Sequence, residues 1–359
     1  MTDGDDTALE AALATALDSR EAVAFVHAGP DRDPAIRYCR SSSSPSAVDR
    51  RGAPIRALAF DGTRWLSVSS ADSAGHPAAD LASGLTDRVG TGTVLTPARI
   101  PHDAALYLEQ AGFSLASTDV VERTRATKTD AERDHVDTAQ AAAAAGVRRA
   151  ASVLADATIE DGRLVASGDA VTPDRLRRAV DEAIIAAGGF PARTTTITAT
   201  DGDAALRSGA PIVVATAPRG PTGYHGGLVR TLVVDSEGGT ERRAHVAVTQ
   251  AFRSVQAMLT ADTESVTAVE ADLEAEVRGF GFGEHPIETR VAGVGLEPAE
   301  RPRDGADEVE PDTVVRVEAA VEFEPDRRIR LADVLAVREH EVEWLAPPSR
   351  SIEPSALLE

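Results

Sequence analysis

The sequence predicts an α/β protein with two domains, and three observations carry this prediction. Before residue 120, apolar runs of strand length alternate with stretches whose apolar residues recur at helical spacing. Thr129 is followed three residues later by Glu132, a capping-box pattern that predicts the start of a long alanine-rich helix. Between Ala210 and Asp235, two apolar runs flank a segment rich in Gly and Pro, which indicates two strands joined by an elaborated turn.

The elements of the first domain follow in order from these patterns. Asp61-Gly62 between two apolar runs is a strong signal for a β-hairpin. The Ser-rich polar segment 45–54 is predicted to be a loop. The expected elements are a helix over 8–18, a buried strand over 21–29, a hairpin over 55–70, a strand over 93–95 and a helix over 104–110 that Gly112 ends.

In the second domain, Thr172-Pro173 predicts the start of a helix that Gly188-Gly189 ends. Gly279–Gly283 (G-F-G-F-G) is expected to be a flexible connection between a helix and a strand. Other expected helices cover 129–156, 172–187, 241–259 and 265–278, and strands are expected over 194–200, 212–214, 228–234, from 314 onward and over 329–337.

Composition excludes several classes of function. The net charge of -21 argues against a nucleic-acid partner, because a phosphate backbone needs a basic footprint. A single cysteine, Cys39, excludes an internal disulfide framework and fits a reducing compartment. No apolar run is long enough to span a membrane, and the acidic N-terminus does not resemble a signal peptide. We therefore expect a cytoplasmic protein with no membrane partner.

The charged residues are unusual in kind. Fifty-eight acidic residues oppose 37 basic ones, and Lys128 is the only lysine. In multimolar salt the Debye length falls to about 3 Å or less, so repulsion between surface carboxylates no longer penalises such a composition. The sequence therefore predicts a halophilic, archaeal origin.

The segment from Ala210 to Asp235 resembles the metal-binding hairpin of the pita-bread metallopeptidases, the family of aminopeptidase P, prolidase and creatinase. The residues that carry the resemblance are Gly223-Tyr224 and Arg230-Thr231, which match the pattern G-Y-x-x-D-x-x-R-T in register. In that family, metal-binding aspartates stand at the positions that Thr216 and Gly227 occupy here. Both carboxylates are missing here.

Other segments keep the frame of this family in the same way. Residues 292–302 are similar to H-G-x-G-L-E-x-H-E-x-P, with Ala292 and Ala299 at the two histidine positions. The strand that begins at Val314 retains the metal-binding glutamate as Glu318. In the strand over 329–337, Ala332 replaces the bridging glutamate. The family frame is also filled by Arg330 and Asp333, and by Arg125, Lys128 and Glu132 in the segment that opens the catalytic domain.

The resemblance implies a creatinase-like α/β domain over 1–122 and a pita-bread domain over 123–359. The family uses two divalent metals, Mn, Co or Zn. Such a pair, held about 3.5–4 Å apart, needs carboxylates to bridge it. Because only Glu318 keeps a ligand, we expect no metal cofactor. A single-metal site from Glu318, Glu322 and His225 is an alternative.

The function that this implies is that of a pseudoenzyme, a homologue of Xaa-Pro peptidases that binds a peptide or a protein. The alternative is an active metal-dependent Xaa-Pro aminopeptidase or dipeptidase. Substrate-binding candidates are Tyr224, His225 and Glu288, no catalytic residue is assigned, and a homodimer is possible.

No other chemistry is indicated. Cys39 has no local signature, and the chain has no G-x-S-x-G elbow and no nucleotide-binding glycine motif. The remaining histidines show no ligand spacing and are expected at the surface: His27, His76, His102, His135, His245 and His340.

Overall fold

The computed structural model describes residues 3–40, 54–199, 205–339, 341–345 and 347–358. The chain divides into two compact units, Met1–Arg125 and Ala126–Glu359. The loop expected over 45–54 and the surface position expected for His340 lie outside these residues, Pro54 excepted.

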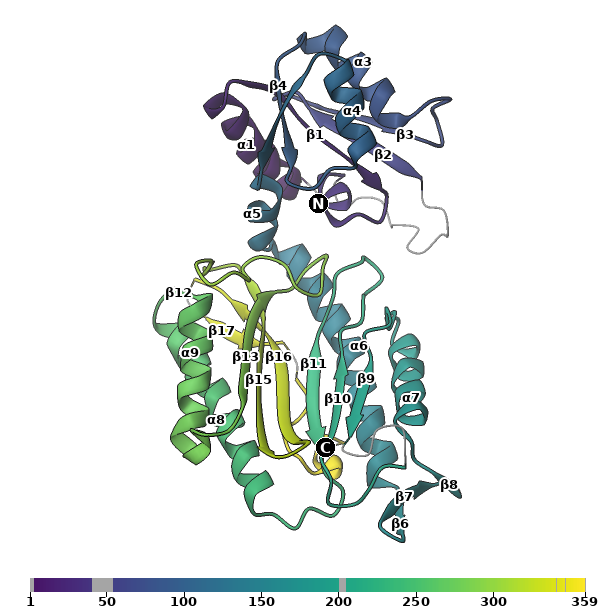
Figure 1. Ribbon diagram of the computed structural model, residues 1–359, viewed down its shortest axis with the longest axis vertical. Coiled ribbons are helices and arrows are strands. Elements are labelled where there is room, and N and C mark those ends of the chain that lie inside the picture. Colours follow the sequence, from purple (N-terminus) through teal and green to yellow (C-terminus); the bar gives the residue numbers. More distant parts are fainter. Residues whose placement is uncertain (1–2, 41–53, 200–204, 340, 346, 359) are drawn as a thin grey trace. The chain divides into compact units, whose positions relative to one another are not determined.

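The first unit is built on a five-stranded sheet of order β3-β2-β1-β4-β5 (Figure 1). The pairs β1–β4 and β4–β5 are parallel, and the other two pairs are antiparallel. Its elements are α1 (Asp3–Ser19), β1 (Ala22–Pro30), α2 (Pro34–Cys39), β2 (Ile55–Phe60), β3 (Trp65–Ser69), α3 (Pro77–Val89), β4 (Thr93–Pro97), α4 (His102–Gln110) and β5 (Ser114–Thr118).

Helices cover both faces of this sheet because side chains alternate along its strands. In β1, Ala24 and Val26 pack against α3 and α4, whereas Phe25 packs against α1 and α2. The expected hairpin is present, with Phe60 paired to Trp65. Asp61 accepts hydrogen bonds from the backbone of Thr63 and Arg64, which closes the turn.

The second unit is built on a seven-stranded antiparallel sheet of order β13-β15-β16-β11-β10-β9, with β17 paired to β16. Its strands are β9 (Thr196–Ala199), β10 (Ile212–Thr216), β11 (Leu228–Leu232), β13 (Ile287–Gly293), β15 (Val314–Glu324), β16 (Arg327–Val337) and β17 (Val342–Trp344). Two small sheets accompany it, formed by β6 (Thr158–Glu160), β7 (Arg163–Ala166) and β8 (Asp169–Ala170), and by β12 (Glu264–Ser265) and β14 (Glu308–Val309).

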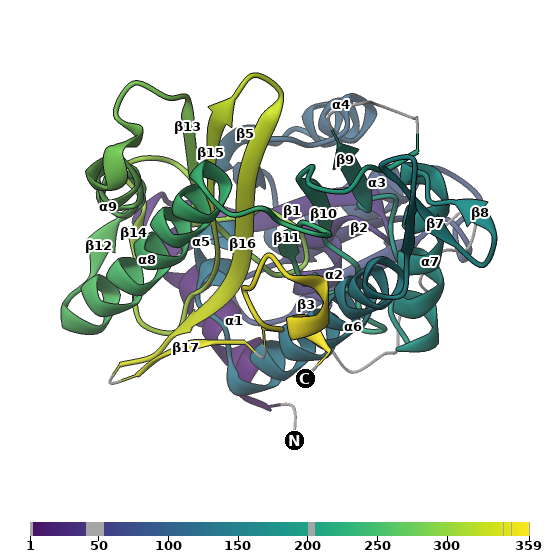
Figure 2. The ribbon, with the colours of Figure 1, turned by 90° about the horizontal axis from the view of Figure 1, so that it is seen from below.

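Helices pack on one face of this large sheet. They are α6 (Asp130–Ala155), α7 (Pro173–Ala186), α8 (Thr240–Ala261) and α9 (Val266–Val277). One core joins α8 and α9 to β13, β15 and β16, and another joins α6 and α7 to β10 and β11. Figures 1 and 2 both show α8 and α9 toward the end of the sheet that holds β13 and β15, and α6 and α7 toward the end that holds β9 and β10. The helices α5 (Val120–Ala126), η1 (Arg278–Phe282) and η2 (Pro354–Leu357) complete the chain.

Helix starts follow the sequence closely. Both halves of the expected capping box are present at α6: Thr129 Oγ1 accepts from the backbone of Glu132, whose carboxylate accepts from the backbone of Thr129. Thr172 caps α7 with Pro173 as its first residue. No helix among the described residues is long and apolar enough to cross a membrane.

Two expectations were wrong. His27 is buried rather than at the surface, because β1 is a central strand covered on both sides, and its Nε2 lies 3.1 Å from Asp33 Oδ1. Gly279–Gly283 is not a free connection, since η1 continues α9 by a turn and buries Phe282 against α8 and α9.

Candidate functional site on the open face of the sheet

The face of the large sheet opposite the helices carries the candidate site. Strand alternation places odd-numbered residues of β15 and β16, such as Val317 and Leu331, in the helix-side core. Even-numbered residues therefore lie on the open face. There the register places Arg290 opposite Glu318, and Glu318 opposite Ala332. Ala332 pairs in turn with Val229 of β11.

The five ligand positions implied by the resemblance lie in and around this face. Gly227 immediately precedes β11, and Ala292 lies opposite Arg316 in the pairing of β13 with β15. Ala332 belongs to a small apolar cluster with Val213, Ala215 and Val229. Thr216 Oγ1 lies 3.2 Å from Thr195 Oγ1, so this hydroxyl bonds within the sheet. The second histidine position, Ala299, is half-buried beside Glu300.

Both carboxylate oxygens of Glu318 are engaged by arginines. Arg330 Nε donates to Glu318 Oε1 at 2.6 Å. Arg316 Nη2 donates to Glu318 Oε2. The Glu318 side chain is only 14% exposed, so the two guanidiniums cover most of it. The one retained metal-ligand position is thus the centre of an ion-pair cluster.

Arg316 also fills the space beside the second aspartate position. A Cβ atom on Gly227 would lie 3.0 Å from Arg316 Cδ and 3.5 Å from its Nε. That Nε is buried and has no hydrogen-bond partner among the residues described. Burial lowers the pKa of Arg316, Glu318 raises it, and the nearby cations Arg330 and Arg290 lower it further.

This donor set does not fit two divalent metals. A dinuclear centre needs several carboxylates with free lone pairs, whereas here one carboxylate is already neutralised by two cations. No group of three or more His, Cys, Asp or Glu side chains in the described ranges is placed to hold a metal ion. The alternative site from Glu318, Glu322 and His225 therefore gains no support.

The frame residues around the site are paired with one another. Lys128 Nζ donates to Glu300 Oε1 at 2.8 Å, and both side chains are buried. Gln140 of α6 accepts from Gly227 N at 2.8 Å and donates to Gly227 O at 3.3 Å. Gly226 approaches the same helix closely, since a Cβ there would lie 2.7 Å from Gln140 N. These contacts hold the hairpin turn against the middle of α6.

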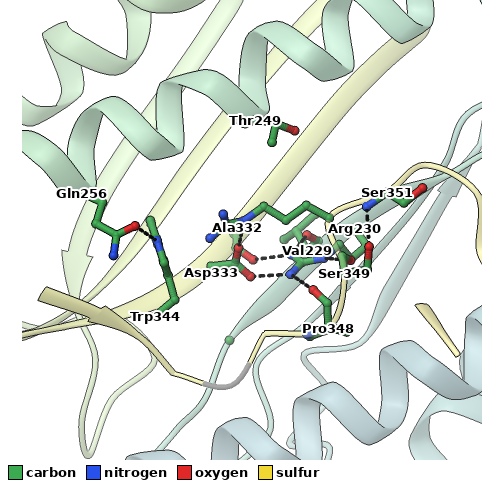
Figure 3. A network of polar contacts seen from close by, with 12 residues as sticks. Val229, Arg230, Thr249, Gln256, Ala332, Asp333, Trp344, Pro348, Ser349 and Ser351 are labelled. Carbon is green, nitrogen blue, oxygen red and sulfur yellow. Dashed lines mark hydrogen bonds and ion pairs between the residues drawn. The ribbon is translucent and has the colours of Figure 1, made fainter. Parts of the chain in front are cut away.

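Arg230 and Asp333 form a second buried pair, on the helix side of the sheet (Figure 3). Arg230 Nη2 donates to Asp333 Oδ1 at 2.6 Å and to Pro348 O at 2.9 Å, and Nε donates to Ser349 O at 3.1 Å. Arg350 Nε donates to the other carboxylate oxygen of Asp333 at 2.5 Å. The C-terminal segment is thereby tied to β11 and β16.

Comparison with known proteins matches residues 134–339 to the sequence pattern of Metallopeptidase family M24. The chain belongs to this family. Its fold agrees with that of other M24-like structures. It is similar to a prolidase from Pyrococcus horikoshii OT3, with a TM-score of 0.76 and 16% identity over 96% of this chain and 99% of that one. It is likewise similar to an Xaa-Pro dipeptidase from Bacillus anthracis, with a TM-score of 0.80 and 15% identity over 97% and 99%.

A further likeness is to dipeptidase PepE from Mycobacterium ulcerans, with a TM-score of 0.74 and 19% identity over 97% of both chains. No curated protein matches the sequence significantly. The expected fold class, α/β with a pita-bread domain, is confirmed.

The three substrate-binding candidates occupy different environments in this M24 chain. Tyr224 is buried, and its hydroxyl donates to Glu132 Oε1 at 2.8 Å. His225 is also buried, with its backbone N–H donating to Gly295 O at 2.7 Å. Glu288 is exposed on β13, 4.0 Å from Arg328. The structure therefore does not bring these three side chains into one group, and their role in binding stays a prediction.

Of the three arginines of the site, sequence reasoning identified Arg330 and missed Arg316 and Arg290. Arg316 lies two residues before Glu318, and Arg290 lies two residues before Ala292. The signal was present, because residues two apart on a strand share a face.

Proposed function

We propose that this chain is an M24-family protein that binds a peptide without metal and without hydrolysing it. The observation that carries the proposal is the engagement of Glu318 by Arg316 and Arg330. The positive charge that metal ions would bring to this glutamate in the family is supplied here by two guanidinium groups of the chain itself.

Two further observations support loss of hydrolysis. Ala292 and Ala299 stand at the histidine positions, so general acid–base catalysis lacks its usual groups. A Cβ atom on Gly227 would lie 3.0 Å from Arg316 Cδ, so a side chain there would require Arg316 to shift slightly. The fold is nevertheless kept through buried pairs such as Lys128–Glu300, which favours a retained binding role.

The peptide as ligand is supported by two similar structures, those of a prolidase and of an Xaa-Pro dipeptidase. Those activities belong to those proteins, and only the ligand class is carried over here. A protein partner and a homodimer remain predictions, and sedimentation of the full chain would decide the second.

The test is metal content and hydrolysis measured on one preparation. Protein incubated with Mn²⁺, Co²⁺ or Zn²⁺ and then desalted is expected to retain no metal by plasma mass spectrometry and to leave Ala-Pro uncleaved. About two equivalents of metal per chain together with cleavage would overturn the proposal in favour of an active Xaa-Pro peptidase. A Glu318→Gln variant is the matched control, and its results are expected to equal those of the wild type.

A further inference from the structure

The open-face arginines form a basic cluster on an acidic chain. We propose that Arg290, Arg316 and Arg330 bind an oxyanion, and that this oxyanion is the C-terminal carboxylate of a peptide. The inference rests on the proposed peptide-binding function and deepens it by naming the group that is recognised.

The geometry of three neighbouring strands brings the cluster together. Arg290 of β13 lies opposite Glu318 of β15 in the sheet register. Arg316 precedes Glu318 by two residues on the same face, and Arg330 reaches Glu318 from β16. Two guanidiniums thus bond to Glu318 and a third belongs to the neighbouring strand, so the three arginines carry two more positive charges than this one carboxylate neutralises, on a chain whose net charge is -21.

The neighbouring charges on this face, those of Glu288, Glu322 and Arg328, sum to one negative charge. Arg328 lies 4.0 Å from Glu288 and 3.8 Å from Glu322. These three residues line a small surface cleft with Pro286 and Ala320. Both carboxylates thus lie within ion-pair distance of Arg328, and neither forms an ion pair with Arg290, Arg316 or Arg330 among the residues described.

The cluster retains hydrogen-bonding capacity for a ligand. Arg316 Nε has no partner within the described parts of the chain, and Arg316 remains 21% exposed at its side chain. Arg290 is exposed and makes no ion pair with any residue described. An arginine presents its N–H groups in a planar fork that matches the two oxygens of a carboxylate.

The choice of a carboxylate over a phosphate rests on the proposed peptide-binding function, because attraction by the guanidiniums and repulsion by Glu318 both grow with the charge of the ligand. A singly charged, planar carboxylate can accept two parallel N–H bonds from one guanidinium. The free C-terminus of a peptide is such a group.

The experiment compares Ala-Pro-Ala, the same peptide with an amidated C-terminus and inorganic phosphate by titration calorimetry at one KCl concentration that keeps the chain folded. The proteins are the wild type, Arg316→Gln and Arg290→Gln, with Arg328→Gln as the matched control on the same face. Circular dichroism checks folding, and the exposed Arg290 provides a variant that leaves the core intact.

We expect amidation to weaken binding by about tenfold or more, the effect of losing one charge-assisted contact. Arg316→Gln and Arg290→Gln should each weaken binding of the free acid and leave the amide unchanged, and Arg328→Gln should change neither. Equal binding of acid and amide would overturn the carboxylate site while the proposed peptide-binding function stands. Binding of phosphate alone, lost in Arg316→Gln, would overturn both the peptide ligand and the proposed function.

Discussion

Arg230 and Asp333 form an ion pair at 2.6 Å in which neither side chain is exposed to solvent. Asp333 receives a second guanidinium from Arg350, which in turn stacks over the rings of Phe252 and Trp344. Burial of charge is unfavourable unless each group is paired and hydrogen-bonded. Asp333 is the shared partner of Arg230 and Arg350, so its loss would leave both guanidiniums without a carboxylate.

Asp333→Asn should therefore destabilise the protein strongly. The substitution leaves the buried Arg230 and the partly buried Arg350 without their shared carboxylate, and we expect a loss of about 3–5 kcal/mol in the free energy of unfolding. Urea denaturation followed by circular dichroism measures it. The control is Asp169→Asn, whose exposed side chain lies 3.7 Å from Arg175 and should change stability by less than about 1 kcal/mol. Equal effects of the two variants would contradict this account.

His245 should make the protein less stable in mild acid. Burial lowers the pKa of His245, the hydrogen bond to Arg350 O raises it, and the cation Arg230 lowers it further. Because the folded-state pKa of His245 lies below the ordinary histidine value of 6.5, the unfolded chain binds a proton first as pH falls. The contribution of neutral His245 to the free energy of unfolding is therefore full above about pH 6.5 and declines as pH falls below it.

The check is the melting temperature of the wild type and of His245→Gln between pH 8 and pH 5, the range around an ordinary histidine pKa. Glutamine still offers an N–H donor but does not titrate. The wild type should lose more stability than the variant over this range, and parallel curves would exclude His245 as the cause.

Gly226→Ala should destabilise the protein because a Cβ there would meet the backbone of α6, 2.8 Å from Ala139 O. Overpacking of this kind costs about 1–3 kcal/mol. Gly84→Ala is the contrasting control, because Gly84 lies within α3 with nothing near its missing Cβ. Alanine there should stabilise the helix by up to about 1 kcal/mol. Thermal unfolding of both variants should therefore shift in opposite directions.

Restoring the family ligands should not by itself restore metal binding. The restored set is Thr216→Asp, Gly227→Asp, Ala292→His and Ala332→Glu. With Arg316 retained, we expect the new Asp at position 227 to pair with that guanidinium and metal content to stay at background. Adding Arg316→Ser removes the competing cation, and metal retention should appear only then. Metal bound equally with and without Arg316→Ser would refute the role given to this arginine.

Much of the fold could be predicted because local signals decide it. The capping box at Thr129 and the Asp61-Gly62 turn act within a few residues, and both are present as expected. The helix α3 and the strand β13 were not predicted, although the buried residues Ala78, Leu81, Ala82 and Leu85 of α3 recur at helical spacing. Their places are decided by packing against the sheets.

The site could be predicted only in part. The family frame located Glu318 and the positions of the absent ligands, and the structure places Gly227 and Ala332 around the same face. The partners of Glu318 depend on how β13, β15 and β16 are registered, which no short segment specifies. The burial of His27 likewise depends on helices that cover β1 from both sides.

The ties made by residues 348–350 also bear on how the protein is made. Arg230 and Asp333 leave the ribosome before Pro348, Ser349 and Arg350, whose backbone and side-chain groups complete their hydrogen bonds. Until those residues emerge, Arg230 and Asp333 lack the hydrogen bonds that compensate the burial of their charges. The second unit should therefore gain its full stability late in translation, and chaperones have their longest opportunity to bind it during that interval.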